Sequence, residues 1–235
     1  MLFRQLFDPV SSTFTYLLAD EGTRAALLID PVREQVERDL ELIRDLGLRL
    51  EMVLETHIHA DHVSAAGVLR SRTGARVVAS ELGAPCVDVR VRHGSRLSLG
   101  SIAIEVLATP GHTDDSISFL IGDRVFTGDA LLIRGSGRSD FQNGDPEVLW
   151  DSLVNVLFQL PRETLVFPGH DYKGRTVSTI GEEVAFNPRV AGRTREQFVE
   201  IMRNLGLPPP AQLDVAVPMN RACGDGNPRV TAERS

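Results

Sequence analysis

Cysteine is nearly absent from this sequence. Of its 235 residues only Cys86 and Cys223 are cysteines, and no Cys-x-x-Cys pair occurs. Metal sites built on thiolates and small folds held by several disulfides both need more cysteines, usually at close spacing. We therefore exclude both classes and expect each cysteine to be a small, buried, apolar residue.

Positive charge and long apolar runs are also scarce. The 25 Lys and Arg residues are outnumbered by 32 Asp and Glu residues, which gives a formal net charge of −7. A face that contacts nucleic acid is basic, so we expect no nucleic-acid partner, and any anion must bind at a local site. No apolar run approaches the roughly 20 residues that span a bilayer, and the N-terminus lacks signal-peptide or transit-peptide features. We expect no membrane contact and a cytoplasmic protein.

The rest of the composition is typical of one catalytic domain. Hydrophobic residues make up 42% of the chain and charged residues 24%. A chain of this length can bury a substantial core, so we expect a single domain over residues 1–235, with a frayed tail from about Ala222. Apolar periodicity and turn signals predict strands at residues 14–18, 25–29, 51–55, 102–108, 116–121, 124–127 and 165–167, and helices at residues 32–46, 61–72 and 146–160.

The densest polar motif directly follows one of the predicted strands. It places His57, His59, Asp61 and His62 within six positions. One histidine alone could be an ordinary core residue, but a buried cluster of four polar side chains is costly unless something binds it. Imidazole is the commonest protein ligand for iron and zinc, and the motif therefore indicates a metal site.

Three later motifs place further ligand-type side chains at strand ends. His112 follows Thr-Pro-Gly after the strand at residues 102–108, Asp129 ends the strand at residues 124–127, and His170 follows Pro-Gly after the strand at residues 165–167. Each alone is weak evidence, because histidines in Pro-Gly turns are common loop residues. Four strand ends that each carry a ligand-type group indicate one site on a rigid scaffold.

These motifs resemble a known family. The order His-x-His-x-Asp-His, Thr-Pro-Gly-His, Gly-Asp and Pro-Gly-His is similar to the metallo-β-lactamase superfamily. The resemblance implies an α+β fold, the αββα sandwich of two mixed β-sheets flanked by helices. The similarity to the persulfide (sulfur) dioxygenases of that superfamily is closer and runs from about Phe3 to about Gly224. The segments that carry it are residues 3–18, 128–142, 170–172, 187–189, 201–205 and 216–220.

The resemblance to persulfide dioxygenases implies a redox enzyme with one Fe(II) per chain. His57, His112 and Asp129 would bind the iron, a two-histidine, one-carboxylate set that leaves positions for O₂ and a sulfur ligand. His59, Asp61, His62 and His170 would surround these ligands and tune them. The expected reaction oxidises glutathione persulfide with O₂ to sulfite and glutathione.

A second hypothesis is left open by the ligand types. A glyoxalase II-like thioester hydrolase would use two metals, one on His57, His59, His112 and Asp129, the other on Asp61, His62, His170 and the same Asp129. All of these residues are present, so their presence does not decide between the two reactions.

The resemblance also suggests substrate contacts and an oligomeric state. Arg138, Tyr172 and Arg189 match positions that the family uses to hold glutathione, whose two carboxylates suit the planar donors of arginine. Ser136 departs from the pattern, because some family members carry cysteine at this position. The family resemblance suggests a homodimer, and the sequence itself shows no interface signature.

Overall fold

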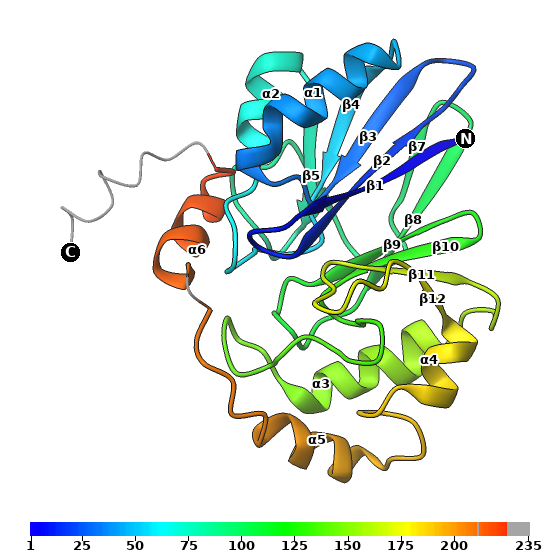
Figure 1. Ribbon diagram of the computed structural model, residues 1–235, viewed down its shortest axis with the longest axis vertical. Coiled ribbons are helices and arrows are strands. Elements are labelled where there is room, and N and C mark those ends of the chain that lie inside the picture. The colour runs from blue at the N-terminus through cyan, green and yellow to red at the C-terminus, as the bar shows by residue number, and fades with distance from the viewer. Residues whose placement is uncertain (211, 225–235) are drawn as a thin grey trace. The chain divides into compact units, whose positions relative to one another are not determined.

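The computed structural model of this chain describes residues 1–210 and 212–224 (Figure 1). The chain divides into two compact units. The first unit contains residues 1–91, 98–102, 209–210 and 212–224, and the second contains residues 92–97 and 103–208. Each unit has its own apolar core, and the expectation of a single domain over residues 1–235 stays a prediction.

The first unit is built on a mixed, six-stranded sheet. In spatial order its strands are β1 (Leu2–Asp8), β2 (Thr13–Ala19), β3 (Ala25–Ile29), β4 (Arg49–Leu54), β5 (Arg76–Ser80) and β6 (Val89–Val91). β1 to β3 pair antiparallel and β3 to β6 pair parallel. Parallel neighbours need a crossover, which α1 (Val36–Asp45) supplies between β3 and β4 and α2 (Ala66–Thr73) supplies between β4 and β5. The apolar side of these helices packs on Leu28, Val53 and Val77 of the sheet.

The second sheet is also mixed and six-stranded. Its strands in spatial order are β12 (Ser178–Thr179), β11 (Leu165–Pro168), β10 (Arg124–Gly128), β9 (Ile117–Ile121), β8 (Ile102–Ala108) and β7 (Arg96–Leu99). β10 and β11 pair parallel, and the segment between them contains α3 (Pro146–Asp151). α3, α4 (Ile180–Phe186) and α5 (Arg195–Arg203) share a core that includes Leu149, Ile180 and Phe198.

Helix starts in the second unit follow their local sequence signals. The Asp145 carboxylate accepts hydrogen bonds from the backbone N–H groups of Glu147 and Val148, and Pro146 occupies the first turn of α3. The predicted helix over residues 146–160 is confirmed in position, but its regular part ends at Asp151 and continues as a π-helical turn over Ser152–Val156. α5 begins with a reciprocal capping box between Thr194 and Gln197.

The expectation of a helix starting at Asp61 is wrong. α2 begins at Ala66, and the residues between β4 and α2 form a loop. The backbone groups of this loop bond outside it: the Ala65 N–H donates to the Pro31 carbonyl, and the Ser64 N–H donates to the Asn220 side chain. Distant partners therefore replace the helical hydrogen bonds that the local sequence allows.

The expectation of two unpaired cysteines is also wrong. Cys86 and Cys223 form a disulfide with a Cα–Cα distance of 6.0 Å. Ala222, Cys223 and Gly224 belong to the described, hydrogen-bonded part of the chain, so the expected frayed tail does not begin at Ala222. The rest of that expected tail, residues 225–235, lies outside the described residues.

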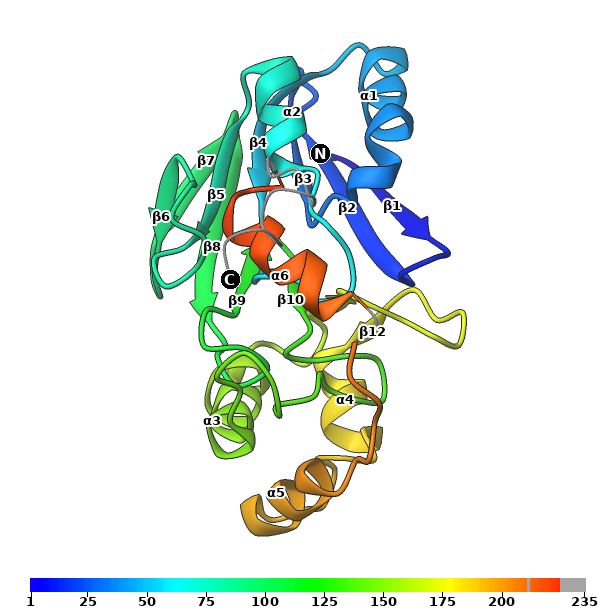
Figure 2. The ribbon, with the colours of Figure 1, turned by 90° about the vertical axis from the view of Figure 1, so that its left-hand side faces the viewer.

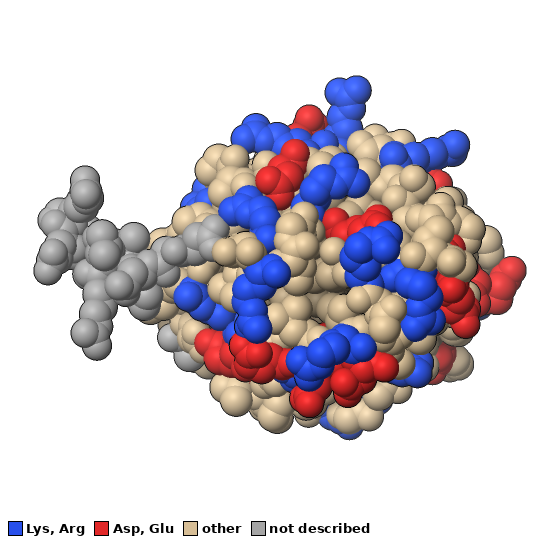
Figure 3. Space-filling model, turned by 90° about the horizontal axis from the view of Figure 1, so that it is seen from above, with Lys and Arg blue, Asp and Glu red and all other residues tan. Residues whose placement is uncertain are grey.

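Two surface expectations can be compared with the structure. No helix in the described part of the chain has the length and apolar content that crossing a membrane requires. On the face drawn in Figure 3, basic and acidic side chains are interspersed. The absence of nucleic-acid and membrane partners stays a prediction.

Asp39 makes a testable contribution to stability. The side chain is almost fully buried in α1, and this burial raises the pKa of its carboxyl to about 6. Arg38 Nη2 lies 2.8 Å from Asp39 Oδ1 and offsets part of the increase in pKa. Between about pH 4 and 6 the folded state binds more protons than the unfolded state, so the free energy of unfolding falls as pH rises through this window. Above about pH 6, the buried carboxylate continues to destabilise the folded state.

We expect Asp39→Asn to raise the free energy of unfolding at pH 7.5 by roughly 1–3 kcal/mol, because the amide carries no charge to desolvate. Urea unfolding at pH 7.5 and pH 4 measures this, and the gain should shrink at the lower pH. Glu41→Gln on the exposed side of the same helix is the matched control. A gain that is equal at both pH values would contradict the assignment to Asp39 ionisation.

Candidate metal centre

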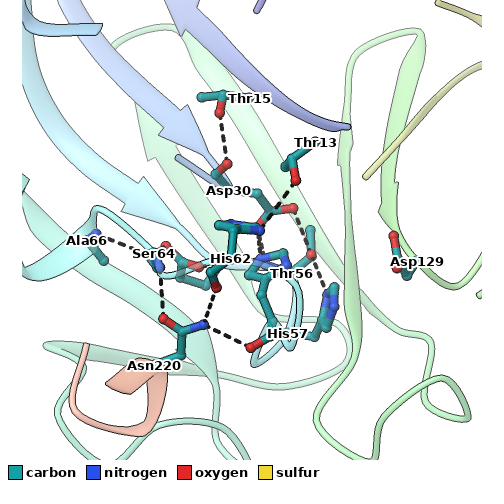
Figure 4. Close-up of polar contacts among 12 residues, drawn as sticks. Thr13, Thr15, Asp30, Thr56, His57, His62, Ser64, Ala66, Asp129 and Asn220 are labelled. Atoms are coloured by element: carbon teal, nitrogen blue, oxygen red, sulfur yellow. Dashed lines mark hydrogen bonds and ion pairs between the residues drawn. The ribbon is translucent and has the colours of Figure 1, made fainter. Parts of the chain in front are cut away.

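The first unit holds His57 in one defined orientation. Asp30, at the end of β3, accepts hydrogen bonds from the Thr56 N–H and the Thr56 hydroxyl, at 2.7 and 2.8 Å (Figure 4). Since the Thr56 hydroxyl hydrogen is used by Asp30, Thr56 Oγ1 accepts the bond that joins it to His57 Nδ1 at 3.0 Å. Nδ1 is therefore the protonated nitrogen, and His57 Nε2 keeps the lone pair that a metal ligand needs.

His59 lies between two carboxylates of the same unit. Its Nε2 is 3.3 Å from Asp30 Oδ1 and 3.6 Å from Glu55 Oε2, and its side chain has no exposed surface. Burial alone lowers the pKa of His59, but the carboxylates of Asp30 and Glu55 outweigh burial and raise this pKa to about 10. Two carboxylates thus surround the His59 ring with negative charge within the first unit.

Asp61 and His62 form a second pair in the same loop. His62 Nδ1 lies 2.9 Å from Asp61 Oδ2, and the Thr13 hydroxyl from β2 donates to the same carboxylate oxygen at 3.2 Å. His59, Asp61 and His62 each offer a ligand atom, and these atoms lie within 4.8 Å of one another. The structure thus brings together three of the residues that the sequence motif predicts.

The second unit brings together His112, Asp129 and His170. Each follows or ends a strand: β8, β10 and β11. His112 Nε2 lies 3.7 Å from Asp129 Oδ2, and His170 Nε2 lies 3.6 Å from Asp129 Oδ1. The three predicted strand-end motifs of this unit therefore converge on one carboxylate.

His112 is oriented by a backbone carbonyl. Its Nδ1 lies 2.6 Å from the Arg138 carbonyl oxygen, which can only accept, so Nδ1 carries the proton and Nε2 faces Asp129 with its lone pair. The loop that supplies this carbonyl approaches the ring closely at Gly137. A Cβ at this position would lie 2.7 Å from His112 Nδ1, so a side chain here would displace the imidazole.

Among the residues that the structure describes, several buried polar atoms at these motifs have no hydrogen-bond partner. They are Asp129 Oδ1 in the second unit and His59 Nδ1, His59 Nε2 and His62 Nε2 in the first. Buried polar atoms without partners are costly and usually signal a ligand or ion. Nitrogen and carboxylate oxygen atoms are the donor set that iron and zinc accept, so the residues of the motifs fit a metal ion.

The two arginines predicted to hold substrate differ in their surroundings. Arg138 already pairs with Asp140 through two bonds, at 2.6 and 2.7 Å, and donates to the carbonyls of Leu207 and Pro208. Arg189 is half-buried and donates to the backbone carbonyl and the hydroxyl of Ser136 at 2.6 and 3.0 Å. No described residue forms an ion pair with Arg189, and burial lowers the pKa of its guanidinium.

Tyr172 follows His170 and is exposed. Its ring stacks on the His170 ring at a centroid distance of 5.9 Å and an interplanar angle of 3°, and 71% of the residue is accessible to solvent. A contact between Tyr172 and the substrate stays a prediction.

Sequence reasoning missed the residues that orient these motifs. Asp30 could have been found, because it is an acidic residue at the end of the predicted strand over residues 25–29. It has a left-handed backbone conformation with φ of 49°, which ends β3 and is tolerated by Asp. Thr56 and Asn220 gave no such signal, because each acts through a hydrogen bond to a group that the sequence pattern does not identify.

The chain is similar to proteins of known name over nearly its whole length. The sequence profile described as Metallo-beta-lactamase superfamily matches residues 8–85 and 87–170. The protein named Persulfide dioxygenase ETHE1, mitochondrial, from Homo sapiens is 48% identical over 231 residues, which is 97% of this chain and 91% of that protein. The Mus musculus protein of the same name is 47% identical over the same shares of both chains.

One solved structure shows the same extent of similarity. The crystal structure of ETHE1 from Myxococcus xanthus matches with a TM-score of 0.95 and 64% sequence identity, and the match covers 95% of this chain and 100% of that chain. Sequence similarity and fold similarity thus extend together beyond the metal-ligand motifs.

Proposed function

This chain belongs to the metallo-β-lactamase superfamily and, within it, to the persulfide dioxygenases, and from this premise we propose that it oxidises glutathione persulfide at one iron(II) ion. The fold class expected from the motifs is confirmed, because two mixed six-stranded sheets and six α-helices in the described residues build a metallo-β-lactamase fold. The observation that carries the function is similarity to persulfide dioxygenases over 97% of the chain. No comparison favours the glyoxalase II-like alternative.

We propose that His57, His112 and Asp129 hold the iron. Two features support this choice: Nδ1 of each histidine is bonded to an acceptor, which places the ring's lone pair on Nε2, and Asp129 has a buried oxygen without a hydrogen bond among the described residues. When bound, iron would supply the redox chemistry that a reaction with O₂ requires. A neutral imidazole and a carboxylate are the protonation states that these three ligands need.

The other motif residues support the ligands. The Asp30 and Glu55 carboxylates lie beside His59 Nε2, and Thr13 and Asp61 contact His62. His170 lies beside Asp129 Oδ1 and could exchange a proton with a ligand there. In this proposal His59, Asp61, His62 and His170 fix charge and orientation around the metal ligands and do not bind the iron.

Arg189 is the residue that we propose to bind a carboxylate of glutathione. A half-buried guanidinium without a paired carboxylate is electrostatically unsatisfied, and an anionic ligand would supply the missing charge. Arg138 already forms an ion pair with Asp140, so fewer of its N–H groups remain to bind an incoming ligand. Arg138 and Tyr172 stay predicted contacts of the same substrate.

Other expectations about partners and location stay predictions. We also propose that the chain forms a homodimer, as the family resemblance suggests. The human and mouse relatives carry the word mitochondrial in their names, whereas the sequence suggested a cytoplasmic protein. Fractionation of the native host would determine the compartment.

The metal and the reaction can be tested together. We expect the anaerobically purified chain to contain one iron per chain and to consume one O₂ for each sulfite formed from glutathione persulfide and water. Elemental analysis, an oxygen electrode and sulfite quantification measure these values in the same sample. Two zinc ions per chain, with hydrolysis of a glutathione thioester and no oxygen uptake, would overturn the proposal.

A further inference from the structure

The loop that carries His57, His59, Asp61 and His62 has few regular hydrogen bonds of its own. It joins the end of β4 to the start of α2 and contains no helix or strand. Buried backbone N–H and C=O groups nonetheless need partners. The partners of this loop decide how firmly the ligand side chains are held.

One side chain supplies three of these partners. The Asn220 amide nitrogen donates to the carbonyl oxygens of His59 and His62, both at 2.9 Å, and its amide oxygen accepts from the Ser64 N–H at 2.8 Å (Figure 4). Asn220 is 6% exposed, so water does not readily replace these bonds. Both donors of the amide are thereby used on carbonyls of the histidine loop, which lie 161 and 158 residues away in sequence.

The helix that carries Asn220 is weak by itself. α6 (Leu213–Arg221) has nine residues and contains Pro218, which removes a helical hydrogen bond. Its buried apolar contacts form a small cluster of Ala216 and Met219 with Val63. Propensity and apolar packing alone therefore provide little to fix Asn220 in place.

A covalent link follows directly after α6. Cys223 forms the disulfide with Cys86, and the Cys223 carbonyl accepts a hydrogen bond from the Gly67 N–H of α2 at 2.7 Å. The Arg33 guanidinium donates to the carbonyl of Gly224. Figure 2 shows the segment after α6 returning toward α2. These bonds thus hold the C-terminal end of α6 next to α2, the helix that follows the histidine loop.

We propose that Asn220 is a positioning residue for the metal ligands and that the Cys86–Cys223 disulfide holds it in place, so that metal affinity responds to thiol reduction. This inference rests on the proposed function for the identity of the metal. The unit formed by α6, Asn220 and the disulfide is called the α6 clamp. A dithiol reductant opens the clamp by giving one hydrogen to each sulfur: the S–S bond breaks, two thiols form, and the dithiol closes to its own disulfide.

Asn220→Ala tests the hydrogen bonds of the clamp. We expect iron binding to weaken about tenfold to a hundredfold, as for other residues that orient ligands without touching the metal. Asn220→Asp should weaken it at least as much at neutral pH, because a carboxylate of nearly the same shape cannot donate to the two carbonyls. Asn204→Ala, which removes an exposed asparagine at the end of α5, is the matched control and should leave iron binding unchanged.

A mild effect of Asn220→Asp beside a large effect of Asn220→Ala would mean that Asn220 only fills space, and would overturn the positioning role. At saturating iron, Asn220→Ala should keep the KM for glutathione persulfide, since Asn220 is assigned no substrate contact. A raised KM at full iron occupancy would also contradict the proposal.

The disulfide is tested by the double variant Cys86→Ser, Cys223→Ser and by dithiothreitol treatment of the unmodified chain. Both should speed hydrogen exchange of the amides in residues 55–65 of the metal-free protein, and both should weaken iron binding less than Asn220→Ala does. Reoxidation should restore the treated chain. Unchanged exchange after confirmed reduction would overturn the role of the disulfide.

Hydrogen exchange in the metal-free chain separates this inference from the proposed function. If the unmodified chain binds no iron, the proposed function fails, whereas faster loop exchange in Asn220→Ala than in Asn204→Ala would still support the clamp. If the chain binds iron and both variants exchange alike, only the clamp fails.

Discussion

Asp129→Ala should abolish iron binding and oxygen uptake, the largest effect that we expect of any single substitution. Asp129 is the only carboxylate in the proposed ligand set, and the two histidine rings of its unit face its two oxygens at 3.7 and 3.6 Å. Alanine removes one ligand and the negative charge that balances the cation. A loss of affinity of at least about a hundredfold follows, because even residues behind the ligands contribute tenfold to a hundredfold.

His62→Ala is the contrasting variant for the number of metals. In the proposed mononuclear site His62 supports the ligands through its contacts with Asp61 and Thr13, so His62→Ala should retain substantial iron while it alters the rate. Asp123→Ala, at the exposed turn before β10, is the control for a general loss of folding. Metal analysis of the three variants after equal anaerobic loading is the measurement. Equal loss of metal in Asp129→Ala and His62→Ala would favour a dinuclear site.

Arg189→Ala should lower kcat/KM for glutathione persulfide about tenfold to a hundredfold at normal iron content. A charge-assisted hydrogen bond contributes roughly 1.5–3 kcal/mol, and this range converts to that loss. The variant also breaks the two bonds to Ser136, so its thermal stability must be measured in parallel. Oxygen consumption against persulfide concentration, with iron quantified in each sample, gives the result.

Arg189→Lys separates charge from geometry. Lysine keeps the positive charge but lacks the planar fork that binds a carboxylate through two bonds, so it should restore only part of kcat/KM. Arg44→Ala, at an exposed position of α1, controls for the removal of one positive charge from an acidic protein. Normal kcat/KM and normal stability of Arg189→Ala would mean that the carboxylate is held elsewhere, and would reopen the assignment of glutathione as the carrier of the persulfide sulfur.

Arg138→Ala should behave differently from Arg189→Ala. Arg138 joins Asp140 to the carbonyls of Leu207 and Pro208, so its loss should reduce stability as well as affinity. The family resemblance did not distinguish the two arginines, because both match positions that the family uses to hold glutathione. Only their neighbours in the folded chain distinguish a paired guanidinium from an unpaired one.

The strands and the ligand types could be predicted because their signals are local. Apolar runs such as residues 25–29 and 102–108 form buried strands wherever they occur in a sheet, and β3 and β8 confirm them. Polar residues directly after such runs, including His112 and Asp129, then lie at strand ends. Short or weakly patterned elements were missed, among them β6 and α6, because their few residues give no clear period.

The sequence by itself determined which chemical groups are available: the histidines and carboxylates of the four motifs, the acidic balance and the scarcity of thiols. The tertiary structure alone decided how they are used. Thr56 and a backbone carbonyl accept hydrogen bonds from Nδ1 of His57 and His112, and so fix the tautomer of each ring. The fold also joins Cys86 to Cys223 and places Asn220 beside a loop more than 150 residues earlier in the sequence. Hydrogen bonds and disulfides act over a few ångströms between groups that only the folded chain brings together, and so no local pattern in the sequence encodes them.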